Sequence, residues 1–101
     1  MLDAYRLYRF PANSRAEVAT FEEQMDKTHR EAHEVLSAWI SEEGEERLIE
    51  ELWDTIHAAE GALRKFKPQQ VRDGYFMVMA KNNERGDYDT EAVRCDDWGL
   101  V

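Results

Sequence analysis

Residues 31–54 read EAHEVLSAWISEEGEERLIEELWD and join the end of one amphipathic segment to the start of another. Between the two segments, residues 41–45 hold Gly44 and three glutamates, which disfavour a continuous helix through poor propensity and mutual repulsion. Residues 31–54 contain nine acids and one base, so they carry −8 of the chain's formal net charge of −9. We therefore expect two helices joined by a sharp turn. Their acidic residues form either a solvated face or a site for cations.

The segment before the turn predicts a helix of about 25 residues, or about 38 Å. Ser14 and Glu17 have the spacing of a capping box, in which a serine hydroxyl and a glutamate carboxylate satisfy backbone amides at a helix start. The helix is therefore predicted to begin at Ser14. Its apolar stripe, at spacings of three, four and seven residues, consists of Val18, Phe21, Met25, Ala32, Val35 and Trp39.

The segment after the turn predicts a second helix of about 20 residues that ends before Pro68. Pro68 can also open a third helix at its first position, where a missing amide hydrogen costs nothing. Residues 69–83 fit a buried strand by composition and a helix by spacing. We predict a helix, because the sequence offers no partner strand. The second stripe consists of Ile49, Leu52, Ile56, Ala59, Leu63 and Phe66.

These segments predict an all-α chain of one domain over residues 1–101. We expect an N-terminal arm at 1–13, a helical core at 14–86 and a C-terminal tail at 87–101. Residues 2–10 of the arm are compatible with a short strand or an extended segment. Because the connecting turn is short, the first two helices are predicted to form an antiparallel hairpin.

One hairpin with a shorter third helix cannot cover all of the large apolar side chains. A homo-oligomer, at least a dimer, would complete a helical bundle and bury them. The aromatic residues that exceed what one hairpin can bury are Trp39, Trp53, Phe66, Tyr75 and Phe76.

The acid excess argues against several classes of partner. The chain has 22 acidic and 13 basic residues, so it offers no basic face for nucleic acid or for an anionic membrane. Charged residues interrupt every apolar run, and the first ten residues hold no apolar core of a secretory signal. The only cysteine, Cys95, cannot form an internal disulfide. We therefore expect a cytoplasmic protein.

Two pairs of acidic residues flank the turn with helical spacing. Glu31 with Glu34, and Glu51 with Asp54, are each three residues apart, so each pair shares one helix face. Both pairs lie at a similar distance from the turn, so the hairpin would bring four carboxylates to one level. Any one pair would also fit an ordinary solvated face. Four converging carboxylates would repel one another and favour a hard divalent cation such as Mg²⁺, with Mn²⁺ as a substitute.

A second polar cluster follows the third predicted helix. Lys81 and Arg85 are four residues apart and could hold a phosphate chain, while Asn82 could bind a base or sugar and Tyr88 could stack on a base. The same residues also fit an ordinary helix end, where basic side chains suit the dipole and Gly86 stops the helix.

The two acidic pairs resemble the E-x-x-E…E-x-x-D signature of the MazG-like all-α nucleoside triphosphate pyrophosphohydrolases. Lys81, Asn82 and Arg85 are similar to the Lys-Asn-x-x-Arg-Gly stretch of small, phage-type members. The resemblance covers roughly residues 17–88. It implies hydrolysis of an NTP or dNTP to the monophosphate and pyrophosphate, and assembly as a homodimer or homotetramer.

This resemblance also implies roles for single residues. The Mg²⁺ ligands would be Glu31, Glu34, Glu51 and Asp54. The nucleotide would be held by Lys81, Asn82 and Arg85.

Chemistry adds two further candidates. Glu34 could take the proton of the attacking water. Arg47, one turn before Glu51, could contact the departing phosphate or could pair with the glutamates around it.

Two positions depart from the family pattern. Arg30 stands where many members have an acid, which would weaken the binding of an additional metal ion. Trp53 stands where the residue is usually small, which would narrow the pocket or place an indole at a subunit interface.

Two other classes of protein compete with this interpretation. In a non-catalytic helical interaction module, the acidic residues would be solvated or bind a partner, and Trp39 and Trp53 would dock a protein. In a di-iron bundle, Asp26 with His29 and Asp54 with His57 would imitate Glu-x-x-His pairs. The aspartates are one methylene shorter than the usual glutamates, and the pairs are unequally placed about the turn.

Overall fold

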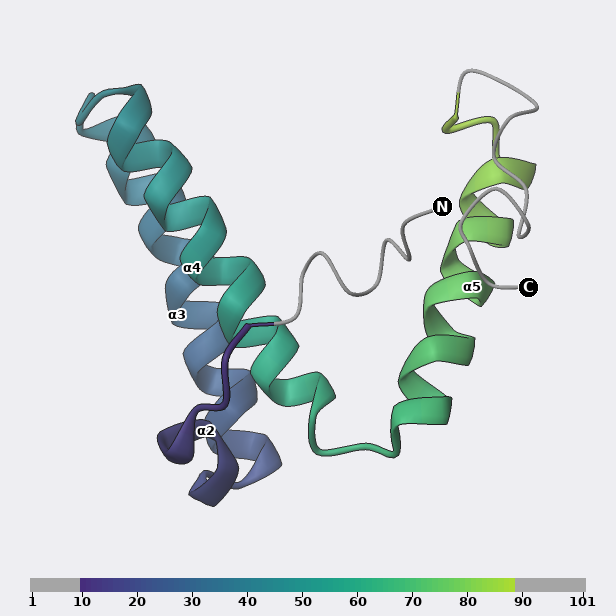
Figure 1. Cartoon of the computed structure of the whole chain (residues 1–101). Helices are drawn as coiled ribbons and strands as arrows, with labels where there is room; N and C mark the ends of the chain where they lie inside the picture. Colours follow the sequence, from purple (N-terminus) through teal and green to yellow (C-terminus); the bar gives the residue numbers. More distant parts are fainter. Residues whose placement is uncertain (1–9, 89–101) are drawn as a thin grey trace. The chain divides into compact units, whose positions relative to one another are not determined.

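The computed structural model describes residues 10–88, which form helices and connecting turns without a strand. The all-α prediction is confirmed for this part of the chain. The expected arm up to Arg9, Cys95 and the rest of the tail from residue 89 lie outside the described residues. The described helices are α2 (Ser14–Val18), α3 (Phe21–Ile40), α4 (Glu45–Leu63) and α5 (Pro68–Glu84) (Figure 1).

The first helical segment is interrupted near its start, so the prediction of one helix from Ser14 is wrong. Asn13, rather than Ser14, caps α2, because its side chain accepts the amides of Arg15 and Ala16. α2 ends at Val18, and a new helix begins after Thr20.

The capping box lies at this second start. The Thr20 hydroxyl accepts the amide of Glu23 at 3.1 Å, and the Glu23 carboxylate accepts the amide of Thr20 at 2.9 Å. Two complete caps within eight residues explain the break, because each satisfies amides that a continuous helix would bond internally.

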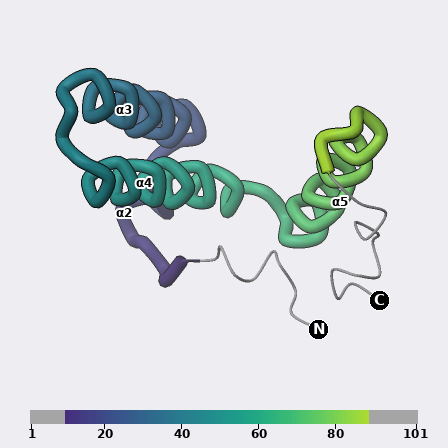
Figure 2. The backbone as a smooth tube through the Cα atoms, turned by 90° about the horizontal axis from the view of Figure 1, so that it is seen from above, coloured from purple at the N-terminus to yellow at the C-terminus, as the bar shows by residue number. Residues whose placement is uncertain are grey.

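The helices α3 and α4 lie side by side along their lengths, as two views of the chain show (Figures 1 and 2). The turn at residues 41–44 connects them, and Gly44 adopts a left-handed φ of 97° that favours glycine. Small residues fill the space between the helices, among them Ala38, Ala58 and Ala62. The Gln24 amide donates to the carbonyl of Ala58 at 2.9 Å in this interface. A Cβ at Gly61 would lie 2.8 Å from Nε2 of Gln24, so α3 and α4 approach each other closely at this position.

The large apolar side chains point away from this interface. On α4, Ile49, Leu52 and Ile56 are 55%, 50% and 37% exposed, although their spacing makes them the predicted stripe. On α3, Leu36 and Trp39 are exposed as well. Within residues 10–88, α3 and α4 therefore bury small and polar side chains and leave much of their large apolar surface exposed.

Side chains just after α4 form hydrogen bonds with the backbone of α2 and of the segment before it. The Lys65 ammonium donates to the carbonyls of Ala16, Glu17 and Ala19, which are the free carbonyls at the end of α2. Arg64 pairs with the buried Glu60 and also donates to a backbone carbonyl before α2.

The segment after Lys65 forms a separate compact unit, and the structure defines the geometry within each unit. α5 begins with Pro68 at its first turn, and the helical prediction for residues 69–83 is confirmed. The helix ends at Glu84, and Gly86 follows with a φ of 77°. None of the helices within residues 10–88 is long and apolar enough to cross a membrane.

Candidate metal centre

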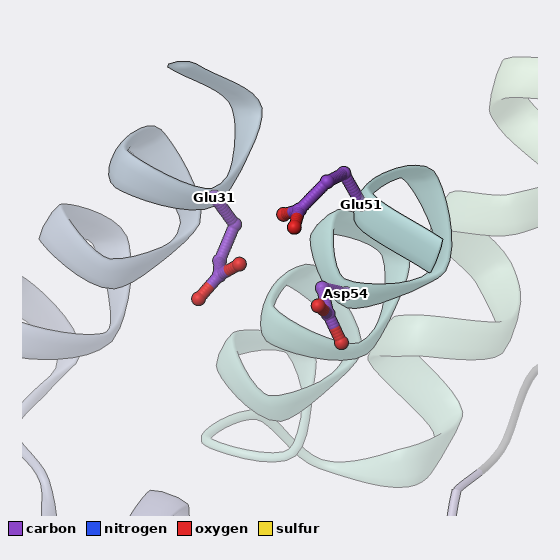
Figure 3. Close-up of side chains that lie close together, drawn as sticks. All are labelled: Glu31, Glu51 and Asp54. Atoms are coloured by element: carbon purple, nitrogen blue, oxygen red, sulfur yellow. The ribbon is translucent and has the colours of Figure 1, made fainter. Parts of the chain in front are cut away.

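Three acidic side chains from α3 and α4 meet between the two helices. Glu31 on α3 and Glu51 and Asp54 on α4 each offer one carboxylate oxygen, and these oxygens lie within 4.8 Å of one another (Figure 3). Glu51 and Asp54 share one face of α4 because they are three residues apart. The small residues of the interface allow the helices to approach closely enough for Glu31 to reach them. Three of the four carboxylates predicted to converge are therefore brought together.

The fourth predicted ligand, Glu34, is not part of this group. It lies one turn after Glu31 on α3 and is exposed. Its charge nevertheless acts on Glu51, so it lies beside the cluster rather than away from it. The second role predicted for Glu34, to accept a proton from an attacking water, stays a prediction.

Glu51 is the most unusual member of the cluster. Its side chain is only 3% exposed, and one of its oxygens, Oε2, is buried without a hydrogen-bond partner. The other oxygen, Oε1, lies 2.7 Å from Nη2 of Arg47. A buried carboxylate oxygen without a partner costs free energy, because it has lost water and gained nothing in return. A divalent cation that binds this oxygen would remove that cost.

The environment of Glu51 disfavours its charge. Burial raises the pKa of its carboxyl above the usual range, and the negative charges of Glu34 and Asp54 raise it further, while Arg47 lowers it. A metal ion would act in the opposite direction, since it binds the ionised form. The site therefore holds a carboxylate whose charge the protein alone does not stabilise fully.

Arg47 is surrounded by acidic residues. Besides Glu51, it pairs with Glu50 through Nη1 at 3.2 Å and with Glu43 through Nε at 3.7 Å. These charges raise the pKa of the guanidinium, Glu51 most of all. Of the two roles inferred from the sequence, pairing with the surrounding glutamates is the one visible in the structure, and contact with a departing phosphate stays a prediction.

A small cavity of about 70 Å³ adjoins the carboxylates. Glu31 and Asp54 line it together with Lys27 and His57, and the His57 ring stacks on Phe10 at a centroid distance of 4.4 Å. The sequence pattern did not indicate Lys27 or Phe10 as residues of the site. Spacing could have identified Lys27, which lies four residues before Glu31 on the same helix face. No spacing rule connects Phe10 to α4, because that contact joins segments far apart in the chain.

The predicted nucleotide-binding residues belong to the unit that contains α5. Lys81 and Asn82 lie in the last turn of α5, and Arg85 caps its end. The Asn82 amide donates to the Tyr88 hydroxyl at 3.5 Å, and the Tyr88 hydroxyl contacts the sulfur of Met79 at 3.3 Å. Their role toward a nucleotide stays a prediction.

The two departures from the family pattern have simple local partners. Arg30 pairs with Asp26 at 3.1 Å on the exposed side of α3. Trp53 packs edge-on against Phe10, with ring centroids 6.3 Å apart. In the described part of the chain no histidine joins a cluster that could hold a metal ion, so the geometry gives no support to a di-iron site at His29 or His57.

Comparison with protein-family models, with curated proteins and with solved structures finds no match for this chain. The carboxylate cluster is therefore interpreted from its own geometry and from the sequence pattern.

The unpartnered oxygen of Glu51 predicts that Mg²⁺ or Mn²⁺ stabilises the folded protein and that Glu51→Gln abolishes this effect. At a free metal concentration 100 times the dissociation constant, binding adds about 2.7 kcal/mol to the free energy of unfolding. Glu46→Gln, which removes one exposed charge from the same helix, should retain the gain. Urea unfolding with and without metal measures it. An equal metal-dependent gain in Glu51→Gln would contradict the assignment of Glu51.

The raised pKa of Glu51 also predicts a pH dependence without metal. Its stabilising contribution is complete below the pKa of an unfolded glutamate, about 4.3, and is lost as pH rises through the raised folded pKa. Glutamine at this position does not titrate. In chelator-treated protein, the stability of the wild type relative to Glu51→Gln should therefore fall as the pH rises above about 4. A constant or rising difference would show that burial of the charge is not destabilising.

Proposed function

We propose that this protein is a Mg²⁺-dependent nucleoside triphosphate pyrophosphohydrolase that resembles the MazG-like family. The observation that carries the proposal is the meeting of Glu31, Glu51 and Asp54, with one buried Glu51 oxygen left unpartnered. Oxygen ligands from two facing helices suit Mg²⁺, which keeps part of its water shell and binds phosphate oxygens at the open positions. The Lys-Asn-x-x-Arg-Gly stretch at the end of α5 adds a second feature of the same family.

The proposed reaction divides its tasks among residues of the chain. Glu31, Glu51 and Asp54 would hold the Mg²⁺, which when bound would neutralise phosphate charge and lower the pKa of a coordinated water. Glu34 would accept the proton of the water as its oxygen attacks the α-phosphorus. The bond from the α-phosphorus to the bridging oxygen would then break, so that pyrophosphate leaves with the electron pair of that bond.

Residues of α5 would hold the nucleotide itself. In the proposed complex, the Lys81 ammonium and the Arg85 guanidinium contact the phosphate chain, and the Asn82 amide binds the base or sugar. Lys81 and Arg85 are exposed at the end of α5, and Asn82 is half-buried between them.

We further propose that the protein acts as a homodimer or homotetramer. The stripe of Ile49, Leu52 and Ile56 on α4 is 37% to 55% exposed, and it has the spacing of a helix face that packs against another helix. Leaving it in water is unfavourable by about 25 cal/mol for each Å² of apolar surface. A second copy with the same stripe would cover it in an isologous interface and complete the bundle.

A non-catalytic helical interaction module is the alternative. Trp39 is 67% exposed, and a partner protein could bury it together with the apolar stripe. Such a module needs no metal ion, so it does not explain why the Glu51 carboxylate is buried with one oxygen unpartnered. Metal-dependent hydrolysis separates the two proposals.

The activity test measures pyrophosphate released from a panel of canonical and damaged NTPs and dNTPs with Mg²⁺ or Mn²⁺. The wild type should hydrolyse at least one nucleotide, and Glu51→Gln should lower the rate by 100-fold or more, because it removes a metal ligand. Glu46→Gln serves as the control with the same charge change. Absence of release from every nucleotide, together with no metal-dependent stabilisation, would leave the interaction module as the better account.

The oligomer prediction concerns Leu52, at the centre of the exposed stripe of α4. Leu52→Glu should convert the wild-type dimer or tetramer into monomers, since it would bury an unpaired charge in the proposed interface. Ser37→Glu introduces the same side chain at an exposed polar position of α3 and should leave the assembly intact. Sedimentation velocity gives the masses. A monomeric wild type would contradict the prediction.

A further inference from the structure

Arg47 is held by three carboxylates, each on a different nitrogen. Its Nε faces Glu43 at 3.7 Å, Nη1 binds Glu50 at 3.2 Å, and Nη2 binds Glu51 at 2.7 Å. A guanidinium is planar and rigid, so contacts in three directions fix both its position and its orientation. Glu43 and Glu50 thus hold an arginine whose third contact is the shortest and reaches the buried carboxylate.

The contact with Arg47 also restricts the rotation of the Glu51 carboxylate about its last side-chain bond. The terminal torsion of a glutamate is broad, so a carboxylate without a donor can rotate about its last bond at little cost. Arg47 takes one oxygen, Oε1, and leaves Oε2 buried without a partner. The carboxylate of Glu51 is directed toward Glu31 across the interface (Figure 3).

From this geometry we propose that Arg47 is a positioning residue of the metal centre. By holding Oε1 of Glu51, it presents Oε2 to a divalent cation bound with Glu31 and Asp54. The inference rests on the metal centre proposed above and gives Arg47 a role other than contact with phosphate. Residues that orient metal ligands in this way commonly change metal affinity by 10- to 100-fold when they are replaced.

If Arg47 is replaced, the positioning role and simple electrostatics predict opposite changes in the affinity for a cation. A positive charge beside a cation site should weaken cation binding, so its removal should tighten binding. If Arg47 positions Glu51, its removal should instead weaken binding. Glu43 and Glu50 offset the positive charge locally, which makes an arginine tolerable beside a cation.

The test is the affinity for Mn²⁺ alone, without nucleotide, measured on the full chain from the electron paramagnetic resonance signal of free Mn²⁺. Arg47→Gln should weaken binding by about 10-fold or more. Arg30→Gln is the matched control, since it removes the same charge from an exposed pair with Asp26, and it should leave affinity unchanged or slightly tighter. Equal or tighter binding in Arg47→Gln would overturn the positioning role while leaving the metal centre standing. Failure of the wild type to bind Mn²⁺ would overturn the metal centre, and the positioning role with it.

A second pair of variants covers the case in which Arg47→Gln does not fold, which far-UV circular dichroism would reveal. Glu50→Gln removes one of the carboxylates that hold Arg47, whereas Glu46→Gln removes a charge from the same turn of α4 that makes no such contact. Glu50→Gln should bind Mn²⁺ several-fold more weakly than Glu46→Gln. Equal affinities would overturn the proposal, because the loss would then reflect charge alone.

Discussion

The carboxylate of Glu51 lies between α3 and α4 with 3% of its side chain exposed, one oxygen paired with Arg47 and the other unpartnered. Folding is costly for such a group, because it gives up water for a single ion pair near two other carboxylates. Burial raises the pKa of Glu51, and the nearby carboxylates of Glu34 and Asp54 add repulsion that Arg47 offsets only in part. The proposed divalent cation would offset this cost, because it would supply the buried oxygen with a ligand bond.

The small residues of the interface make this arrangement feasible. Ala38 on α3 and Ala58 and Ala62 on α4 are buried, and the carboxylates of Glu31, Glu51 and Asp54 lie close together from the same two helices. The larger apolar side chains of both helices are exposed. The same helix pair therefore carries both the carboxylate cluster and an exposed apolar surface. The proposed oligomer would use that surface, and the proposed catalytic centre would use the cluster.

Local signals in the sequence identified the helices after residue 20, the turn at Gly44 and the start of α5 at Pro68. The spacing of three residues within each acidic pair, and the similar distance of both pairs from the turn, anticipated that Glu31, Glu51 and Asp54 would meet. The break before Phe21 was missed because two capping signals competed, and the Thr20 hydroxyl with Glu23 forms the better-bonded start. Contacts between distant segments, such as Phe10 on His57, have no periodic signal.

The spacing of apolar residues predicted a helix at α4, but it does not predict which surface buries those residues. In the structure Ala58 and Ala62 of α4 are buried, whereas Ile49, Leu52 and Ile56 are exposed. Glu34 shows the same limit at the site. Its spacing puts it on the face of Glu31, yet it is exposed and acts on Glu51 without joining the group of three carboxylates. Side-chain reach across an interface depends on the exact crossing of the helices, which spacing alone does not determine.

The central claim is that Glu31, Glu51 and Asp54 together bind a divalent cation. Anomalous diffraction from crystals of the protein soaked in Mn²⁺ tests it most directly, because the Mn²⁺ signal locates the ion without any assumption about activity. The account predicts an anomalous peak within coordination distance of all three carboxylates, with Oε2 of Glu51 among the ligands. Ordered Mn²⁺ elsewhere in the crystal with no peak between these residues would contradict it.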